Sequence, residues 1–274
     1  YTRDSSLSLS LSAPPDIVPN KYRLQLKANI PEMNPAFDTY RIGTVLEMVR
    51  AMVLPLVYEG KKVRICVQQS LGEGVLSGMP LALSSMLPVL VRMDWQGKQL
   101  PIKEGEEGEI RFGRVGPEYV KDDDDVIIII APQNVVGGSL MSSLEAMIKK
   151  AEEREREGER ERERGICLIN PLLEDKPSSN NVMQVRGRKE RREFADSFQE
   201  IYCMRLLYPS TGGYMYPIRG LLARKDVYNP YVAYSQELGG GSEKYEAIAA
   251  FPVKERKAPD ISEISNLFTS NKRK

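Results

Sequence analysis

Four consecutive isoleucines at 127–130 constrain the fold of this chain more than any other stretch. They lie in the sequence "DDDDVIIIIAPQN" (122–134), between an acidic run and a turn that contains Pro132. A strand that is apolar on both faces must be covered on both faces, and inner strands of parallel sheets have that environment. The sequence therefore predicts a covered central sheet with Ile127–Ile130 in its middle.

The acidic run Asp122–Asp125 is open to two interpretations. Ligands of open α/β sheets bind beyond the carboxyl ends of the strands, whereas this run comes before its strand. We therefore interpret it as a solvated turn that keeps the isoleucine strand in place. A divalent-metal site is the alternative, because carboxylates are the usual ligands of such ions.

The segments around this strand alternate between strand and helix patterns. Apolar residues recur at helical spacing within 42–56, and the runs 21–31, 61–69, 109–116 and 165–173 are typical of strands. Alternation of this kind predicts an α/β fold, namely a Rossmann-like, three-layer, mostly parallel sheet.

The pattern changes after residue 202, where short β-rich runs are separated by Gly, Pro and Asn. Hairpin signals of this kind predict an antiparallel β meander of about four strands. The expected organisation is an N-terminal arm (1–20), an α/β sheet domain (21–185), a β-rich C-terminal part of the same domain (186–268) and a basic tail (269–274).

A charged helical projection is expected at 152–164, where Glu and Arg alternate. Such a run forms ion pairs between residues four apart, and we expect it to bury nothing.

The whole chain has 39 basic and 38 acidic residues, so no overall field attracts nucleic acid. No apolar stretch reaches the roughly 18–20 residues that span a bilayer, and we expect no transmembrane segment.

Histidine is absent from the chain. This excludes Ser-His-Asp triads, Cys-His pairs and histidine-containing zinc sites. Cys66, Cys167 and Cys203 are far apart, and no CxxC pair exists. We interpret them as buried core thiols of a reducing compartment. The prediction is a protein that is not an enzyme and needs no cofactor and no metal.

Two places could nevertheless form a ligand crevice. Gly72 and Gly74, in "SLGEGVLSG", follow a predicted strand and precede a predicted helix, which is the context of a phosphate-binding turn. Gln133, Asn134 and Asn170 follow two predicted strands, where α/β folds bind ligands. The alternative is that these residues only cap helices and shape turns. A nucleotide- or small-molecule-binding enzyme of the doubly wound class therefore stays open.

Tyrosines gather between residues 202 and 234, within the predicted meander. Tyrosine is enriched at protein interfaces, although β-sheets also favour aromatic residues. We expect a partner-binding surface that combines these tyrosines with the basic cluster from 186 to 192. Its candidate residues are Arg186, Arg188, Arg191, Tyr208, Tyr214, Tyr216, Tyr228 and Tyr231.

Several motifs occur in a recognisable order: "IIIIAPQN", "CLINPLL", "FADSFQEIYCMRLLYP", "GLLARK" and "KAPDISEISNLF". This arrangement resembles a domain of unknown function of plants, algae and cyanobacteria. That domain occurs in the low-photosystem-II-accumulation proteins of chloroplasts and is also fused to a plastid adenylate kinase. The resemblance covers roughly residues 30–268.

This resemblance implies a nuclear-encoded protein of the chloroplast, soluble or peripheral on the stromal side of the thylakoid membrane. Its expected role is non-enzymatic: to help assemble photosystem II, notably by the insertion of an inner-antenna chlorophyll protein. Its partners would be proteins of a photosynthetic membrane complex. A stably bound peripheral subunit of a photosystem is the alternative, and the resemblance transfers no catalytic residues.

Overall fold

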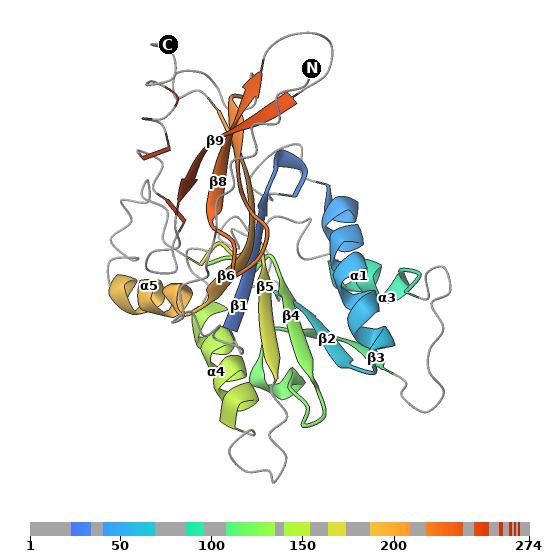
Figure 1. Cartoon of the computed structure of the whole chain (residues 1–274). Coiled ribbons are helices and arrows are strands. Elements are labelled where there is room, and N and C mark those ends of the chain that lie inside the picture. Colours follow the sequence, from blue (N-terminus) through green and yellow to red (C-terminus); the bar gives the residue numbers. More distant parts are fainter. Residues whose placement is uncertain are drawn as a thin grey trace, which may run out of the picture.

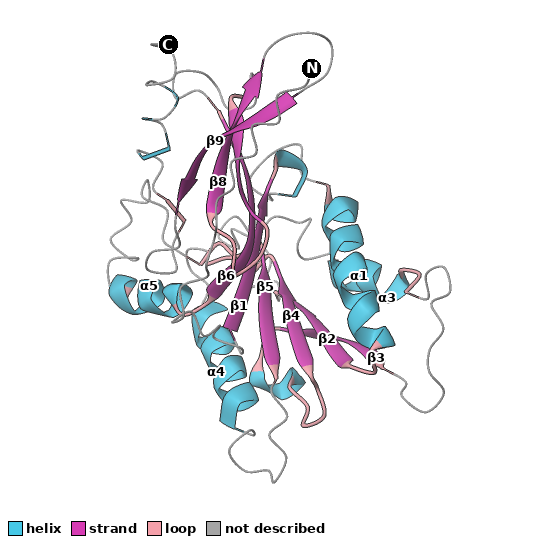
Figure 2. Ribbon diagram, in the orientation of Figure 1, coloured by secondary structure: helices cyan, strands magenta, loops and turns pink. Residues whose placement is uncertain are grey.

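The computed structural model describes residues 23–33, 41–68, 86–95, 108–134, 140–153, 164–173, 187–208, 218–237, 244–251 and parts of 258–268. These residues form one nine-stranded sheet with helices on both faces of its parallel half (Figures 1 and 2). The strand order is β3-β2-β4-β5-β1-β6-β7-β8-β9.

The strands from β3 to β6 pair in parallel, and those from β6 to β9 pair antiparallel. The parallel strands are β1 (Arg23–Asn29), β2 (Lys62–Val67), β3 (Glu109–Arg114), β4 (Val126–Ile130), β5 (Gly165–Ile169) and β6 (Gln199–Leu207). The remaining strands are β7 (Gly220–Arg224), β8 (Tyr231–Glu237) and β9 (Lys244–Phe251). The helices are α1 (Ile42–Tyr58), α3 (Met86–Arg92), α4 (Leu140–Glu153) and α5 (Arg188–Asp196), with short turns η1 (Pro31–Met33) and η3 (Pro117–Tyr119).

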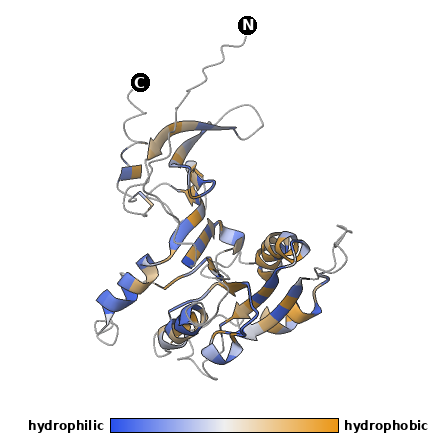
Figure 3. Cartoon of the chain, turned by 60° about the horizontal axis from the view of Figure 1, so that its bottom comes forward, coloured by the Kyte–Doolittle hydropathy of each residue, from blue (hydrophilic) through white to orange (hydrophobic). Residues whose placement is uncertain are grey.

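The isoleucine strand lies where the sequence predicts it. β4 is an inner strand between β2 and β5, and Ile127–Ile130 are buried. Ile128 and Ile130 belong to the apolar cluster beneath α1 and α3, whereas Ile127 and Ile129 belong to the cluster beneath α4. Burying each of these side chains contributes about 1.5–3 kcal/mol, so β4 is a main source of core stability. The hydrophobic colouring of the central strands is visible in Figure 3.

Helix α1 follows the apolar spacing of its sequence. Val45, Leu46, Val49 and Val53 are buried and lie on one face of the helix. Gly60, with a φ of 79°, follows the helix in the left-handed conformation that often ends helices.

The direction of the chain across the sheet creates two switch points at the carboxyl edge. From β1 the chain reaches β2 and β3 through α1 and α3 on one face, and it returns to β4, β5 and β6 with α4 and α5 packed against the other. Neighbouring connections therefore diverge between β2 and β4, and again between β5 and β1. Such switch points are the usual ligand sites of doubly wound sheets.

The C-terminal part is an antiparallel meander of four strands, as predicted, although its first strand β6 also pairs in parallel with β1. Cys203, Leu222 and Ala233 face a small apolar cluster that includes Ile264. The meander therefore continues the parallel sheet through β6, with one register shift where β6 pairs with β1.

The prediction that the charged run 152–164 buries nothing is wrong at its last residue, Arg164. Helix α4 ends at Glu153, and 154–163 lie outside the described residues. Arg164 is buried and donates hydrogen bonds to four backbone carbonyls, those of Lys121, Asp122, Asp124 and Ala151. A guanidinium has enough donors to bind several carbonyls at once, so Arg164 connects the acidic turn with the end of α4.

Candidate functional site

The acidic turn before β4 contains a buried ion network centred on Asp124. The prediction of a solvated turn is therefore wrong at this residue. Asp124 is 3% exposed, and its carboxylate accepts hydrogen bonds from Arg64 Nε at 2.5 Å and Arg64 Nη2 at 3.0 Å. Arg111 Nη1 also donates to Asp124, at 3.1 Å. Arg64 and Arg111 are direct neighbours on β2 and β3, so Asp124 neutralises two adjacent buried or half-buried cations.

The other aspartates of this turn also have specific partners. Asp123 accepts hydrogen bonds from Arg111 at 2.5 and 2.8 Å and from Lys62 Nζ at 2.8 Å. Arg111, and after it Lys62, hold the pKa of the Asp123 carboxyl well below its usual range. Asp125 accepts the backbone N–H of Lys62 at 2.8 Å. Among the described residues no cluster of three or more potential ligands could hold a metal ion.

The first switch point, between β2 and β4, is bridged by Gln68, a residue that the sequence does not single out. Its Nε2 donates to the carbonyl of Gln133 at 3.1 Å, and its Oε1 accepts the N–H of Gln133 at 2.8 Å. These two bonds join the ends of β2 and β4 across the switch point. Gly72 and Gly74, which the sequence places after β2, lie outside the described residues.

The second switch point, between β5 and β1, is bridged by Asn170, directly after β5. Its Oδ1 accepts the N–H of Ala28 at 2.6 Å, and its Nδ2 donates to the carbonyls of Ala28 at 3.2 Å and Met33 at 3.1 Å. Asn170 has a φ of 46°, and Ala131, which directly follows β4, has a φ of 45°. Left-handed backbone is rare outside glycine, and asparagine tolerates it better than alanine.

The structure thus brings Gln133, Asn134 and Asn170 to one edge of the sheet. Gln133 and Asn134 form hydrogen bonds through their backbone groups, and the Asn170 side chain bonds backbone groups. Gln133 forms an isolated parallel bridge with Leu172, and the N–H of Asn134 donates to the carbonyl of Leu172. The Asn170 amide donates its Nδ2 hydrogens to two backbone carbonyls. This geometry favours the alternative interpretation, in which these residues shape turns.

Asn170→Ala is expected to lower the free energy of unfolding by about 2–4 kcal/mol, because it leaves buried backbone groups unsatisfied and puts a Cβ without polar compensation at a positive φ. Asn170→Gly is the matched control, since it loses the same hydrogen bonds without the left-handed penalty. We expect it to be about 1 kcal/mol less destabilised. Urea denaturation measures both variants, and equal stability of Asn170→Ala and the native chain would contradict the role assigned to the amide.

A buried polar cluster connects the parallel half to the meander. Glu200 on β6 accepts the hydroxyl of Tyr231 at 2.7 Å and forms an ion pair with Lys27 Nζ at 3.2 Å. Tyr231 is fully buried, so it offers no surface to a partner, and its place in the predicted binding surface is corrected. Burial, and then the charge of Glu200, raise the pKa of the Tyr231 phenol.

Arg224 organises the backbone around this cluster. Its guanidinium donates to the carbonyls of Glu200 at 2.6 Å, Val227 at 2.6 Å and Asn229 at 3.1 Å. It also lies over the ring of Tyr231, 5.0 Å from the ring centroid. Arg224 is 1% exposed, so it fixes the turn between β7 and β8 from inside the protein.

Tyr228 lies on that turn with 61% of its surface exposed. Asp226 Oδ1 accepts the backbone N–H groups of Tyr228 at 2.8 Å and Asn229 at 3.0 Å. Asn229 Nδ2 donates to Asp226 Oδ2 at 2.6 Å. The backbone below the exposed ring is therefore held by the Asp226 side chain on one side and by Arg224 on the other.

Helix α5 carries the described part of the predicted basic cluster. None of its residues is fully buried, and it packs on the core beneath α4 through Phe194 and Ala195. Arg188 is exposed and Arg191 is half-buried. The placement of the remaining predicted surface residues is as follows: Tyr208 is half-buried, and Arg186, Tyr214 and Tyr216 lie outside the described residues.

The three cysteines are buried and form no disulfide. Burial raises the pKa of the Cys66 and Cys167 thiols to about 12. Burial, and then the nearby Glu200 charge, also raise the pKa of Cys203. Because the thiolate is the reactive form, these side chains behave as core residues.

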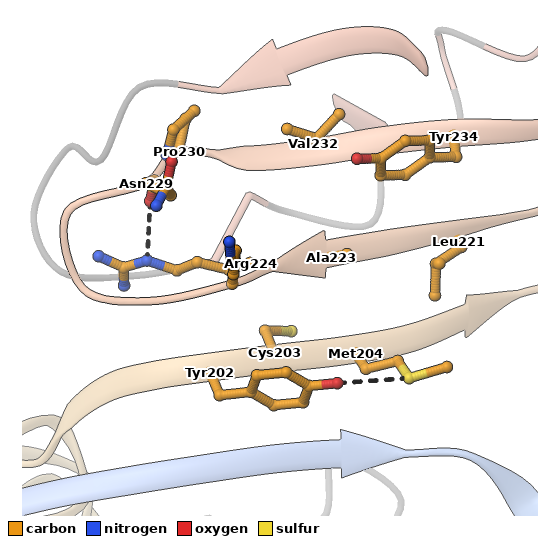
Figure 4. A pocket seen from close by; sticks show the side chains of 11 residues that line it. Tyr202, Cys203, Met204, Leu221, Ala223, Arg224, Asn229, Pro230, Val232 and Tyr234 are labelled. Atoms are coloured by element: carbon orange, nitrogen blue, oxygen red, sulfur yellow. Dashed lines mark hydrogen bonds between the residues drawn. The ribbon is translucent and has the colours of Figure 1, made fainter. Parts of the chain in front are cut away.

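The face of the meander opposite Glu200 is apolar and hollowed. A cavity of about 420 Å³ lies over β6, β7 and β8, and Figure 4 shows side chains that line it. No helix in the part of the chain that the structure describes is both long and apolar enough to cross a membrane.

These features define a class: a doubly wound α/β protein whose sheet is extended by an antiparallel meander. The buried charged side chains named above, in the part of the chain that the structure describes, bind other groups of the protein. The chain belongs to the DUF1995 family, because the model of that family, described as a domain of unknown function, matches residues 13–265. No solved structure was found to match this fold.

Proposed function

We propose that the protein is a non-enzymatic assembly or auxiliary factor that acts on a photosynthetic membrane complex, photosystem II in the first place, on the stromal side of the thylakoid membrane. The resemblance of its motifs to the low-photosystem-II-accumulation proteins supports this role. Such a factor needs a surface that is ready to bind another protein. The observation that carries the proposal is the exposed Tyr228 on its fixed turn.

An exposed aromatic side chain on a fixed backbone favours association for an entropic reason. Binding costs free energy when loops and side chains must be ordered, and Asp226 and Arg224 already hold the backbone beneath Tyr228. A tyrosine has few rotatable bonds and a large contact area, and tyrosines are enriched among the residues that dominate binding energy. Tyr228 is therefore the best-placed anchor among the predicted residues that the structure describes.

Helix α5 supplies the second contact of the proposed surface. It carries Arg188, Lys189, Arg191 and Arg192 against three acidic residues, and it gives little area to the core. Charges of this kind change the rate and the specificity of association more than the affinity. We expect α5 to guide the approach of an acidic partner and Tyr228 to supply binding energy.

The test is recovery of photosystem subunits from gently solubilised thylakoids by the tagged protein. Tyr228→Ala is expected to lower this recovery by about tenfold, because losing an interface anchor costs about 1.4 kcal/mol or more. Val91→Ala is the matched control, since Val91 on α3 is also an exposed apolar residue, and it should leave recovery unchanged.

Different outcomes separate the alternatives. Recovery in fixed stoichiometry that survives high salt and detergent would favour a permanent peripheral subunit over a transient factor. If the native protein recovers no photosystem subunit, or if Tyr228→Ala recovers them as well as the native protein does, the proposal is wrong.

A further inference from the structure

The hollow on the meander has the size and lining of a small-molecule site. Six half-buried apolar or aromatic side chains face it: Tyr202, Met204, Leu221, Ala223, Val232 and Tyr234 (Figure 4). They come from three adjacent strands and alternate with the buried residues of the opposite face, so the floor of the hollow is a β-sheet. Its volume of about 420 Å³ lies within the range of about 300–1,000 Å³ that is usual for ligand pockets.

The charge around this hollow has one sign. Among the described residues that line the hollow, Lys225 and Arg224 are the charged ones, and none of these residues is a carboxylate. The Arg224 guanidinium is committed to three backbone carbonyls. Lys225 is exposed and has no recorded ion pair with the described residues. Its ammonium group is therefore the cation that a ligand in the hollow would meet.

A further polar group within the hollow can change its partner. The hydroxyl of Tyr202 donates to the sulfur of Met204 at 3.6 Å, and a thioether is a weak acceptor. A carboxylate oxygen is a far stronger acceptor, so the phenol would gain by turning to it. An apolar floor with one ammonium and one weakly bonded hydroxyl is complementary to an apolar molecule with an anionic group.

We infer that the hollow binds a small amphiphilic carboxylate, whose apolar chain or ring lies on the floor of β6, β7 and β8 and whose carboxylate pairs with Lys225. A single ammonium suits a carboxylate, whereas a phosphate group is usually held by guanidinium forks or several backbone N–H groups. This site goes beyond the proposed function and does not depend on it.

The experiment is isothermal titration calorimetry of the whole chain with three probes of equal chain length: laurate, dodecanol and dodecyltrimethylammonium. Laurate and the cation are kept below their micelle concentrations, and dodecanol is kept below its solubility limit. Laurate is expected to bind at one site, dodecanol more weakly, and the cation most weakly. Lys225→Met should weaken laurate by about fivefold, the upper value for one exposed ion pair, and should leave dodecanol unchanged.

Two controls keep the result specific. Lys189→Met removes a similarly exposed ammonium on α5, and it should change none of the affinities. Ala223→Trp should fill the hollow and abolish binding of laurate and dodecanol, with far-UV circular dichroism confirming that the variant is folded. Val232→Phe is the second filling variant if Ala223→Trp does not fold.

The inference is overturned if laurate shows no saturable binding, if dodecyltrimethylammonium binds as tightly as laurate, or if Lys225→Met leaves laurate unaffected. Tyr228→Ala should keep full laurate affinity. A failure of the hollow as a ligand site is therefore distinguishable from a failure of the proposed protein contact.

Discussion

Asp124→Ala is expected to lower the free energy of unfolding by about 3–5 kcal/mol, because it leaves a buried guanidinium without its counter-charge. The side chains of Asp124 and Arg64 are 0% and 4% exposed, and two hydrogen bonds join them. Arg111 loses a partner in the same substitution. Urea denaturation, with the slope of the transition compared between variants, measures the loss.

Asp123→Ala is the matched control for this prediction. Asp123 lies one residue away and also binds Arg111, but 41% of its side chain is exposed, so its loss should cost less than about 1 kcal/mol. Because the pKa of Asp123 is lowered in the folded state, its contribution is present at neutral pH and is lost as the pH falls below its ordinary value. Equal destabilisation by both substitutions would contradict the distinction between the buried and exposed aspartates.

Arg224→Met is expected to destabilise the protein by about 3–5 kcal/mol, since it removes a buried guanidinium and leaves the carbonyls of Glu200, Val227 and Asn229 without their donor. Methionine keeps most of the apolar stem, so the loss reports the polar contacts. Chemical denaturation measures it. Limited proteolysis should detect cleavage in the turn 225–230, which the substitution loosens.

Lys225→Met is the neighbouring control for that experiment. Lys225 is exposed, and a surface substitution of this kind changes stability by less than about 0.5 kcal/mol. The role assigned to Arg224 is wrong if Arg224→Met unfolds at the same urea concentration as the native chain, or if its turn resists proteolysis equally well.

The parts of the fold that are predictable from the sequence depend on local patterns. The run Ile127–Ile130 requires cover on both faces whatever its neighbours are, and it is buried between α1 and α4. The spacing of Val45, Val49 and Val53 fixes the buried face of α1 in the same way. The spacing of apolar residues and the number of faces that must be buried are properties of a single segment. They can therefore be predicted from one sequence.

The polar contacts could not be predicted, because their partners are chosen by strand register. Arg64 and Asp124 are 60 residues apart, and Tyr231 and Glu200 are 31 residues apart. Only the pairing of distant strands brings them together. The one local signal is an arginine inside the otherwise apolar strand "VRICV", which implies a buried counter-charge without naming it.

The residues of the predicted binding surface differ in their exposure for a similar reason. Tyr228 and Tyr231 are three residues apart and have the same composition around them, yet one is 61% exposed and the other is fully buried. The difference arises because Tyr228 lies on the turn and Tyr231 begins β8, facing Glu200. The place of each tyrosine, on the turn or at the start of β8, therefore goes with its exposure.

Strand β6 has a consequence for how this protein can be divided experimentally. It is the last parallel strand and also the first strand of the meander, bonded to β1 on one side and to β7 on the other. A truncated chain that stops before β6 would expose the backbone donors and acceptors of β1 along its whole length, and an exposed flat edge recruits other chains. Such a fragment should precipitate or form fibrils, so the predicted boundary near residue 185 is no place to cut. The change from parallel to antiparallel pairing lies beyond that boundary, at β6 itself.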